Sequence, residues 1–225
     1  ASDVYKRQGL NRSSPVDASI IATAVPIFVL LLAAVILKEP ITRKKSFGVF
    51  MGVSGGLLLV FSSTHAIDSI SSLDGDMMMI VSGLMYAIYL VLSKPLSLRY
   101  SSVTMMKWMF LFTTLTLVPF TFRHVLDAPA FHREVWDFTE LGAIFYVLFG
   151  ATFLPYLLIP MSLKRIRPTT VSMYNYVQPI VASFIAVMIG QDTLSWQKVL
   201  SAVLVFTGVY LVTQSKSRED MEKGK

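Results

Sequence analysis

The sequence contains no cysteine, and only 15% of its 225 residues are charged. Without cysteine the chain forms no disulfide, offers no thiol nucleophile and binds no metal through sulfur. His124 and His132 stand eight residues apart, which matches no common zinc spacing, so we expect no metal and no cofactor. A soluble domain carries about a quarter charged residues. The shortage of charge, together with 54% hydrophobic residues, predicts an integral membrane protein.

Long apolar segments recur along the chain. A bilayer core about 30 Å thick is crossed by about 20 helical residues, and backbone in lipid must form its own hydrogen bonds, so we expect these segments to be helices. The sequence predicts an all-α integral membrane protein with seven transmembrane helices. The predicted spans are Ala18–Leu37, Phe47–Ser63, Asp76–Leu92, Val103–Phe122, Leu141–Leu163, Thr169–Gly190 and Val199–Thr213.

Positive charge is distributed unevenly among the links between these spans. The links after the first, third and fifth spans and the C-terminal tail hold thirteen Lys and Arg residues, whereas the opposite side holds four. Cytoplasmic loops of membrane proteins are enriched in Lys and Arg. We therefore expect a multi-pass protein of the plasma membrane, the inner membrane in bacteria, with a cytoplasmic C-terminus. This bias accounts for the net charge of +6, so we expect no nucleic-acid partner.

The chain resembles itself when it is shifted by 153 positions. The matched pairs, without any gap, include Pro15 with Pro168, Pro26 with Pro179, Glu39 with Asp192, Thr42 with Ser195, Lys45 with Lys198 and Gly55 with Gly208. Apolar residues match easily by chance, but two prolines, an acidic residue and a glycine in one register do not. Accidental similarity is the alternative interpretation.

The two copies are predicted to cross the membrane in opposite directions. The first copy begins with the first span and the second copy with the sixth, and an odd difference in span order inverts a copy. Inverted repeats are typical of secondary transporters, in which two like halves enclose one central site. The repeat therefore predicts a transporter that works by alternating access.

A series of motifs occurs in a fixed order over nearly everything after residue 8. They are Ser14-Pro15-Val16-Asp17-Ala18-Ser19, Val25-Pro26, Leu37-Lys38-Glu39-Pro40-Ile41-Thr42, Gly75-Asp76, Tyr86-Ala87 with Tyr89, Tyr176-Val177-Gln178-Pro179 and Gly190-Gln191-Asp192-Thr193-Leu194-Ser195. In these motifs the sequence resembles the EamA-like branch of the drug/metabolite transporter superfamily. The family commonly has Glu-Pro where this chain has Gln178-Pro179, and Glu where it has Asp192, so carboxylate-based coupling at residue 178 is not expected.

The resemblance implies a fold of ten helices in two inverted five-helix repeats, of which this chain holds seven. On that map residues 9–63 are the C-terminal part of the first EamA-like repeat, and 64–74 are a linker. Residues 75–214 are the second repeat, and 215–225 are a cytoplasmic tail. Residues 1–8 match nothing that follows, and we interpret them as a non-native tail, with a short native tail as the alternative.

The strongest candidates for a substrate site lie in the sixth span. Asn175 and Gln178 are three residues apart on one helical face, and Tyr174 flanks them. Amides both donate and accept hydrogen bonds, which suits an uncharged or zwitterionic solute. Pro26 and Pro179 occupy matching positions of the two copies and each removes a backbone donor, so they predict paired helix breaks or hinges near a central site.

Tyrosines in two other spans are weaker candidates for substrate contact. Tyr86 and Tyr89 belong to a polar stripe at helical spacing in the third span, and Tyr156 lies in the fifth span. Polar groups inside spans are costly, so they face a partner or a water-filled cavity. The stripe in the third span therefore lines a substrate path or packs against another helix, and the sequence leaves both open.

Gly48, Gly52 and Gly56 place small residues along one face of the second span. Such faces permit close contact between helices. The contact is either internal or between two copies, so a homodimer through this face is one of the two interpretations.

Together these features predict a secondary transporter of small metabolites or drugs, an exporter or exchanger rather than an enzyme. The alternatives are a seven-helix receptor or another membrane protein without transport activity. A receptor has no reason to repeat its first spans as its sixth and seventh. An intramembrane enzyme needs a Ser/His, paired Asp or metal cluster within the spans, and the sequence contains none there.

Overall fold

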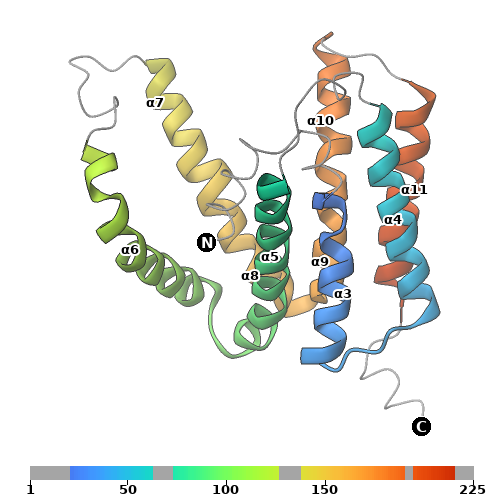
Figure 1. Cartoon of the computed structure of the whole chain (residues 1–225), viewed down its shortest axis with the longest axis horizontal. Helices are drawn as coiled ribbons and strands as arrows, with labels where there is room; N and C mark the ends of the chain where they lie inside the picture. Colours follow the sequence, from blue (N-terminus) through green and yellow to red (C-terminus); the bar gives the residue numbers. More distant parts are fainter. Residues whose placement is uncertain (1–20, 63–72, 127–137, 191–194, 216–225) are drawn as a thin grey trace. The chain divides into compact units, whose positions relative to one another are not determined.

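The computed structural model describes residues 21–62, 73–126, 138–190 and 195–215, and every regular element in these ranges is helical (Figure 1). In chain order the elements are α3 (Val25–Ile36), α4 (Arg43–Ser62), α5 (Leu73–Arg99), α6 (Ser102–Leu126), α7 (Phe138–Phe145), the π-helix η2 (Tyr146–Phe153), α8 (Leu154–Arg165), α9 (Pro168–Met173), the 3₁₀ turn η3 (Tyr174–Tyr176), α10 (Val177–Met188) and α11 (Trp196–Thr213). The prediction of an all-α chain is confirmed.

Five helical segments in the described part of the chain are long and apolar enough to cross a membrane. They are Arg43–Phe61, Met77–Arg99, Leu141–Arg165, Pro168–Met188 and Trp196–Thr213, and a shorter apolar helix covers Ile21–Ile36. Two of the predicted spans, Leu141–Leu163 and Thr169–Gly190, thus continue through local breaks in helix type. The third predicted span ends at Leu92, but α5 continues through Pro95 to Arg99. Neighbouring groups commonly compensate for proline within membrane helices.

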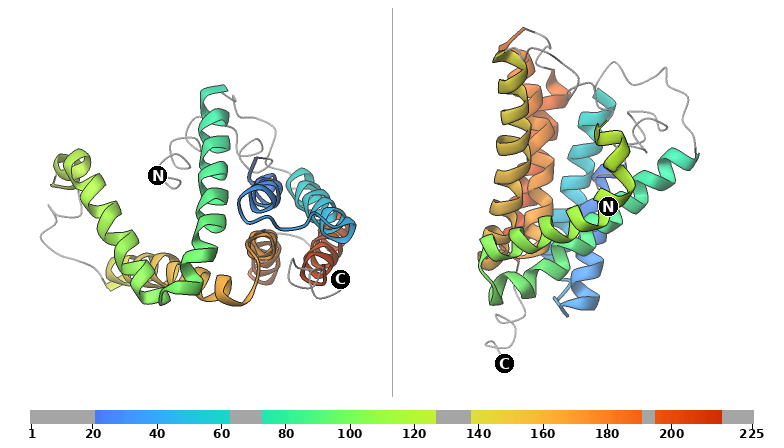
Figure 2. Two further views of the ribbon diagram at one scale, coloured as in Figure 1. Left: turned by 90° about the horizontal axis from the view of Figure 1, so that it is seen from below. Right: turned by 90° about the vertical axis from the view of Figure 1, so that its left-hand side faces the viewer.

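The described chain forms two compact units. Unit 1 comprises the described residues of 21–92 and 166–215, and unit 2 comprises the described residues of 93–165. Figure 2 shows the helices of each from two further directions.

In unit 1, α4 and α11 pack side by side through glycine (Figures 1 and 2). A Cβ atom added to Gly48 would lie 2.8 Å from the carbonyl oxygen of Gly208, and one added to Gly55 would lie 2.9 Å from that of Ser201. Contacts therefore move backwards along α11 as they move forwards along α4, so the two helices are antiparallel. The absence of side chains at these points lets the backbones touch.

The 153-residue register of the sequence exchanges these two contacts. It carries Gly55 onto Gly208 and Gly48 onto Ser201. The contact of Gly55 with Ser201 thereby becomes the contact of Gly208 with Gly48. Each matched helix thus meets its counterpart through the same pair of positions, which is the contact pattern of a two-fold arrangement.

A second contact in unit 1 joins α3 to the α9–η3 segment. The Tyr176 hydroxyl donates a hydrogen bond to the Thr23 carbonyl oxygen, and these two residues are also 153 positions apart. Around this bond lies the core of unit 1. Its buried members are Leu30, Val49, Met173, Tyr176, Val205, Val209 and Val212.

The glycine face of α4 is used inside the chain. Besides Gly48, a Cβ on Gly52 would meet Met173 and Tyr176, and one on Gly56 would meet Thr23 and Tyr176. These three glycines therefore form helix contacts within one chain, which is one of the two interpretations that the sequence left open. A dimer through the same face would have to displace these contacts.

Unit 2 contains the end of α5, then α6, α7, η2 and α8. The Lys94 ammonium donates to the Leu163 carbonyl oxygen over 2.5 Å, and the rings of Phe110 and Tyr156 meet edge to face at 5.5 Å. These contacts hold α8 against the helices before it.

Candidate functional site

The sixth predicted span is not a uniform α-helix. It begins as α9, tightens into the 3₁₀ turn η3 over Tyr174–Tyr176 and resumes as α10, with Pro179 in its first turn. In the matching helix the backbone makes a turn at Ala24, and α3 then begins with Pro26 in its first turn. Each proline therefore follows a local departure from α-helical geometry. The missing N–H of proline and the clash of its ring with the preceding turn are the physical reason.

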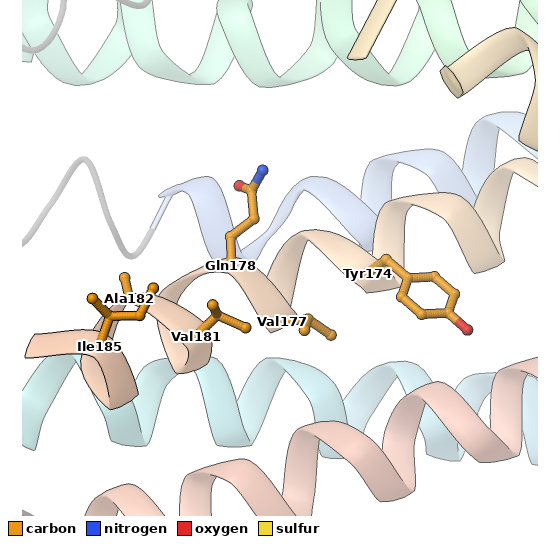
Figure 3. Close-up of a pocket in the computed structure, with 6 residues that line it drawn as sticks. All are labelled: Tyr174, Val177, Gln178, Val181, Ala182 and Ile185. Atoms are coloured by element: carbon orange, nitrogen blue, oxygen red, sulfur yellow. The ribbon is translucent and has the colours of Figure 1, made fainter. Parts of the chain in front are cut away.

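A groove of about 430 Å³ runs along this irregular segment (Figure 3). Its lining residues come from η3 and α10 and recur at helical spacing: Tyr174, Val177, Gln178, Val181, Ala182 and Ile185. The groove is open on one side, and only the amide of Gln178 and the hydroxyl of Tyr174 carry polar side-chain atoms in Figure 3. The lining is almost wholly apolar, and in Figure 3 the amide of Gln178 extends away from the side chains of Val177 and Val181.

The structure brings together only part of the predicted site. Gln178 and Tyr174 share the groove, and both are exposed. Asn175 lies one residue along the same turn but does not line the groove, and its side chain is half-buried. An amide pair acting together on one solute therefore remains a prediction.

The other predicted tyrosines lie elsewhere. The rings of Tyr86 and Tyr89 on α5 contact each other, with their centroids 6.2 Å apart. Tyr156 belongs to unit 2 and packs against Phe110. Their participation in the same solute site stays a prediction.

The sequence did not single out a buried ion pair in unit 1. The Lys45 ammonium lies 2.5 Å from the Glu39 carboxylate, and the Lys45 side chain is 0% exposed and that of Glu39 10% exposed. The predicted second span begins at Phe47 and leaves Lys45 in the link before it, but α4 begins at Arg43 and contains Lys45. One signal was present: Glu39 and Lys45 stand six residues apart at the boundary between two spans and match acidic and basic residues in the second copy.

A second polar group lies at the same end of unit 1. The Arg167 guanidinium donates to the carbonyl oxygens of Val212 and Ser215, at 3.0 and 2.8 Å. Val212 lies in the last turn of α11 and Ser215 just beyond it, so Arg167 adds a donor where the helix runs out of backbone N–H groups. A cation at a helix C-terminus is also favoured by the helix dipole.

Comparison with known proteins identifies the family. The EamA-like transporter family matches residues 7–61 and 73–214, which is most of the chain. The chain belongs to this family. The resemblance drawn from the motifs is thereby confirmed, including its place in the drug/metabolite transporter superfamily.

Individual relatives agree with this assignment. An uncharacterized transporter of Archaeoglobus fulgidus is 26% identical over 205 residues, which cover 91% of this chain and 68% of the relative. A protein of Salmonella typhimurium named "Probable amino-acid metabolite efflux pump" is 24% identical over 201 residues, covering 86% of this chain and 66% of that protein. The chain spans about two thirds of the length of these relatives.

The fold has a counterpart among solved structures. A crystal structure matches 94% of this chain and 71% of its own chain, with a TM-score of 0.77 and 18% sequence identity. At this identity the match concerns the fold alone.

Membership of the EamA-like family decides between the classes that the sequence left open. The chain is part of a multi-pass membrane transporter and not an enzyme. The receptor interpretation has no support from the two relatives described above, which are named a transporter and an efflux pump.

Proposed function

We propose that the protein is a secondary transporter of the bacterial inner membrane that exports small amphipathic metabolites by alternating access. The groove along α10 carries this proposal. It presents a row of apolar side chains with Gln178 and Tyr174 among them, on a helix interrupted by a 3₁₀ turn. Interrupted helices in corresponding positions of two repeats commonly line the substrate site of a secondary transporter.

The contacts of unit 1 support an inverted repeat. The antiparallel pairing of α4 with α11 follows the 153-residue register, and the hydrogen bond between Tyr176 and Thr23 joins residues matched by the same register. Two inverted elements of the same structure can adopt two equivalent arrangements, and each arrangement opens the central site to one side of the membrane. Such a pair is the mechanical basis of alternating access.

The chemistry of the groove indicates the class of solute. Ligand pockets are mostly apolar with a few polar groups that set orientation. Here an uncharged amide replaces the carboxylate that is common in the family, so a zwitterionic or uncharged solute fits better than a cation. The relative from Salmonella typhimurium, named for amino-acid metabolite efflux, suggests amino-acid derivatives with apolar side chains.

Metabolite profiling tests this function. Cells that carry the complete gene, cells that lack it and cells with Gln178→Ala are compared for solutes in the medium and the cytoplasm. We expect a small amphipathic solute to accumulate outside only with the parent protein. Ser183→Ala on the same helix is the matched control, because Ser183 does not line the groove.

The two variants distinguish loss of a groove contact from general damage to the fold. Export that is lost in Gln178→Ala but retained in Ser183→Ala, at equal membrane expression, supports the proposed site. Equal export by both variants would exclude Gln178 from the substrate path, and no difference between cells with and without the gene would contradict export.

A further inference from the structure

Four helix ends of unit 1 meet around Lys45. Lys45 lies in the first turn of α4, where its backbone N–H donates to the Thr42 hydroxyl at 3.2 Å. Glu39 follows the end of α3 and forms the ion pair with the Lys45 ammonium. Arg167 precedes α9, binds the last carbonyl groups of α11 and lies within electrostatic range of Lys45. Figure 1 shows these ends of α3, α4, α9 and α11 at the lower edge of the drawing.

The backbone before Glu39 has an unusual conformation. The N–H groups of Leu37 and Glu39 both donate to the Ala33 carbonyl oxygen, and Lys38 between them has a φ of 54°. This is the left-handed turn that normally ends a helix with glycine. A lysine there is strained, and strain of this kind is kept where the local structure has a function. Here the turn places the Glu39 carboxylate beside Lys45.

The second copy has a different environment at the matching position. Lys198 begins α11 as Lys45 begins α4, and its backbone N–H is likewise directed at the Ser195 hydroxyl, which matches Thr42. The Lys45 side chain is fully buried, whereas Lys198 is only half-buried. Two like positions at opposite ends of antiparallel helices therefore differ in exposure. Lys45 is therefore the more deeply enclosed of the two matched lysines.

We propose that the Glu39–Lys45 ion pair is a latch that holds this end of unit 1 closed during one half of the transport cycle. The inference rests on the alternating-access function proposed above. A buried ion pair is stable only while both partners stay together, and a single buried charge left behind is strongly unfavourable. Removing one partner therefore favours the arrangement in which water reaches the other. The intact pair favours the closed arrangement.

Residues 1–225 contain no cysteine, so an introduced cysteine can serve as a reporter once any cysteine elsewhere in the full-length protein has been replaced by serine. Thr169→Cys is introduced into the full-length protein as a reporter, because Thr169 is 0% exposed and lies two residues after Arg167. Inside-out and right-side-out membrane vesicles are treated with a membrane-impermeant maleimide, and the rate of labelling is measured. Use of both vesicle types makes the result independent of the orientation of the protein.

Glu39→Gln is expected to raise the labelling rate by roughly tenfold or more, because it breaks the ion pair and lets the end open. Reversal of both charges, Glu39→Lys with Lys45→Glu, is expected to restore slow labelling, to within about twofold of the parent rate. Lys198→Met is the matched control at the other end and should leave labelling of Thr169→Cys unchanged.

Three results would overturn the latch. These are unchanged labelling in Glu39→Gln, fast labelling in the doubly reversed variant, and equal acceleration of a second buried reporter, Ala87→Cys on α5, which would indicate general loss of packing. The assay needs no substrate. A failure of the proposed transport function would thus appear as absent flux with these labelling differences intact, and a failure of the latch as unchanged labelling with flux intact.

Discussion

Individual glycines determine how closely the helices of unit 1 approach. Gly208 is the tightest point, because a Cβ there would lie 2.5 Å from the Gly48 carbonyl oxygen and 2.8 Å from the Gly52 backbone nitrogen. Both obstacles are backbone atoms, which cannot rotate away. At Gly52 the nearest atom is instead the flexible end of the Met173 side chain. The spacing of glycines predicted a close helix contact, but only the structure identifies α11 as the partner of α4.

Gly208→Ala should therefore destabilise the protein by about 1–3 kcal/mol, the usual effect of forcing extra atoms into a packed interface. Thermal unfolding of the purified protein in detergent measures this effect. Gly142→Ala is the matched control, because a Cβ at Gly142 meets nothing within 4 Å. A melting temperature for Gly208→Ala equal to that of the control would refute the close contact.

At the scale of the element, the fifth predicted span contains eight residues of π-helix, Tyr146–Phe153. The Thr152 hydroxyl donates to the Val147 carbonyl oxygen five residues earlier, at 2.8 Å, and Pro155 follows in the first turn of α8. A proline ring clashes with the carbonyl group four residues before it, and a wider turn relieves that clash. Hydropathy predicted the span, but it averages over many residues and says nothing of hydrogen-bond register.

Pro155→Ala should allow α-helix to replace part of η2, because it restores a backbone donor and removes the clash. A π-turn holds more residues per turn than an α-turn, so the segment should become longer. Pulsed electron paramagnetic resonance between nitroxide labels on Gly142→Cys and Leu158→Cys reports this length. An identical distance in the proline and alanine forms would show that Pro155 does not cause the π-helix.

At the scale of the whole molecule, the sequence predicted the seven helical segments and the register that relates the two copies. Those features repeat along the chain and so are visible in one dimension. The burial of Lys45 was not predicted. Its partner Glu39 stands only six residues away, but Arg167 and the end of α11, which complete its surroundings, come from distant parts of the sequence. Of the predicted substrate-site residues, Gln178 and Tyr174 line the groove, whereas Asn175 on the same turn does not, and their contact with a solute stays a prediction.

The antiparallel pairing of α4 with α11 predicts that their first turns lie on opposite sides of the membrane. Ser46→Cys and Gln197→Cys, both at exposed positions, test this in a chain without other cysteines. An impermeant maleimide added to intact cells should label Gln197→Cys and spare Ser46→Cys, since the positive-inside rule places the start of α4 in the cytoplasm. Labelling of both from outside would contradict the proposed topology.

The most direct test of the transport mechanism is counterflow in proteoliposomes that contain the complete protein. Vesicles are preloaded with the unlabelled solute identified by profiling, and uptake of the labelled solute is followed. A carrier that alternates access releases unlabelled solute outside and returns with labelled solute, so preloading should accelerate uptake of the label. Gln178→Ala should reduce this acceleration, and Ser183→Ala should retain it. Saturable uptake that preloading does not accelerate, or uptake equal to that of protein-free vesicles, would contradict alternating access.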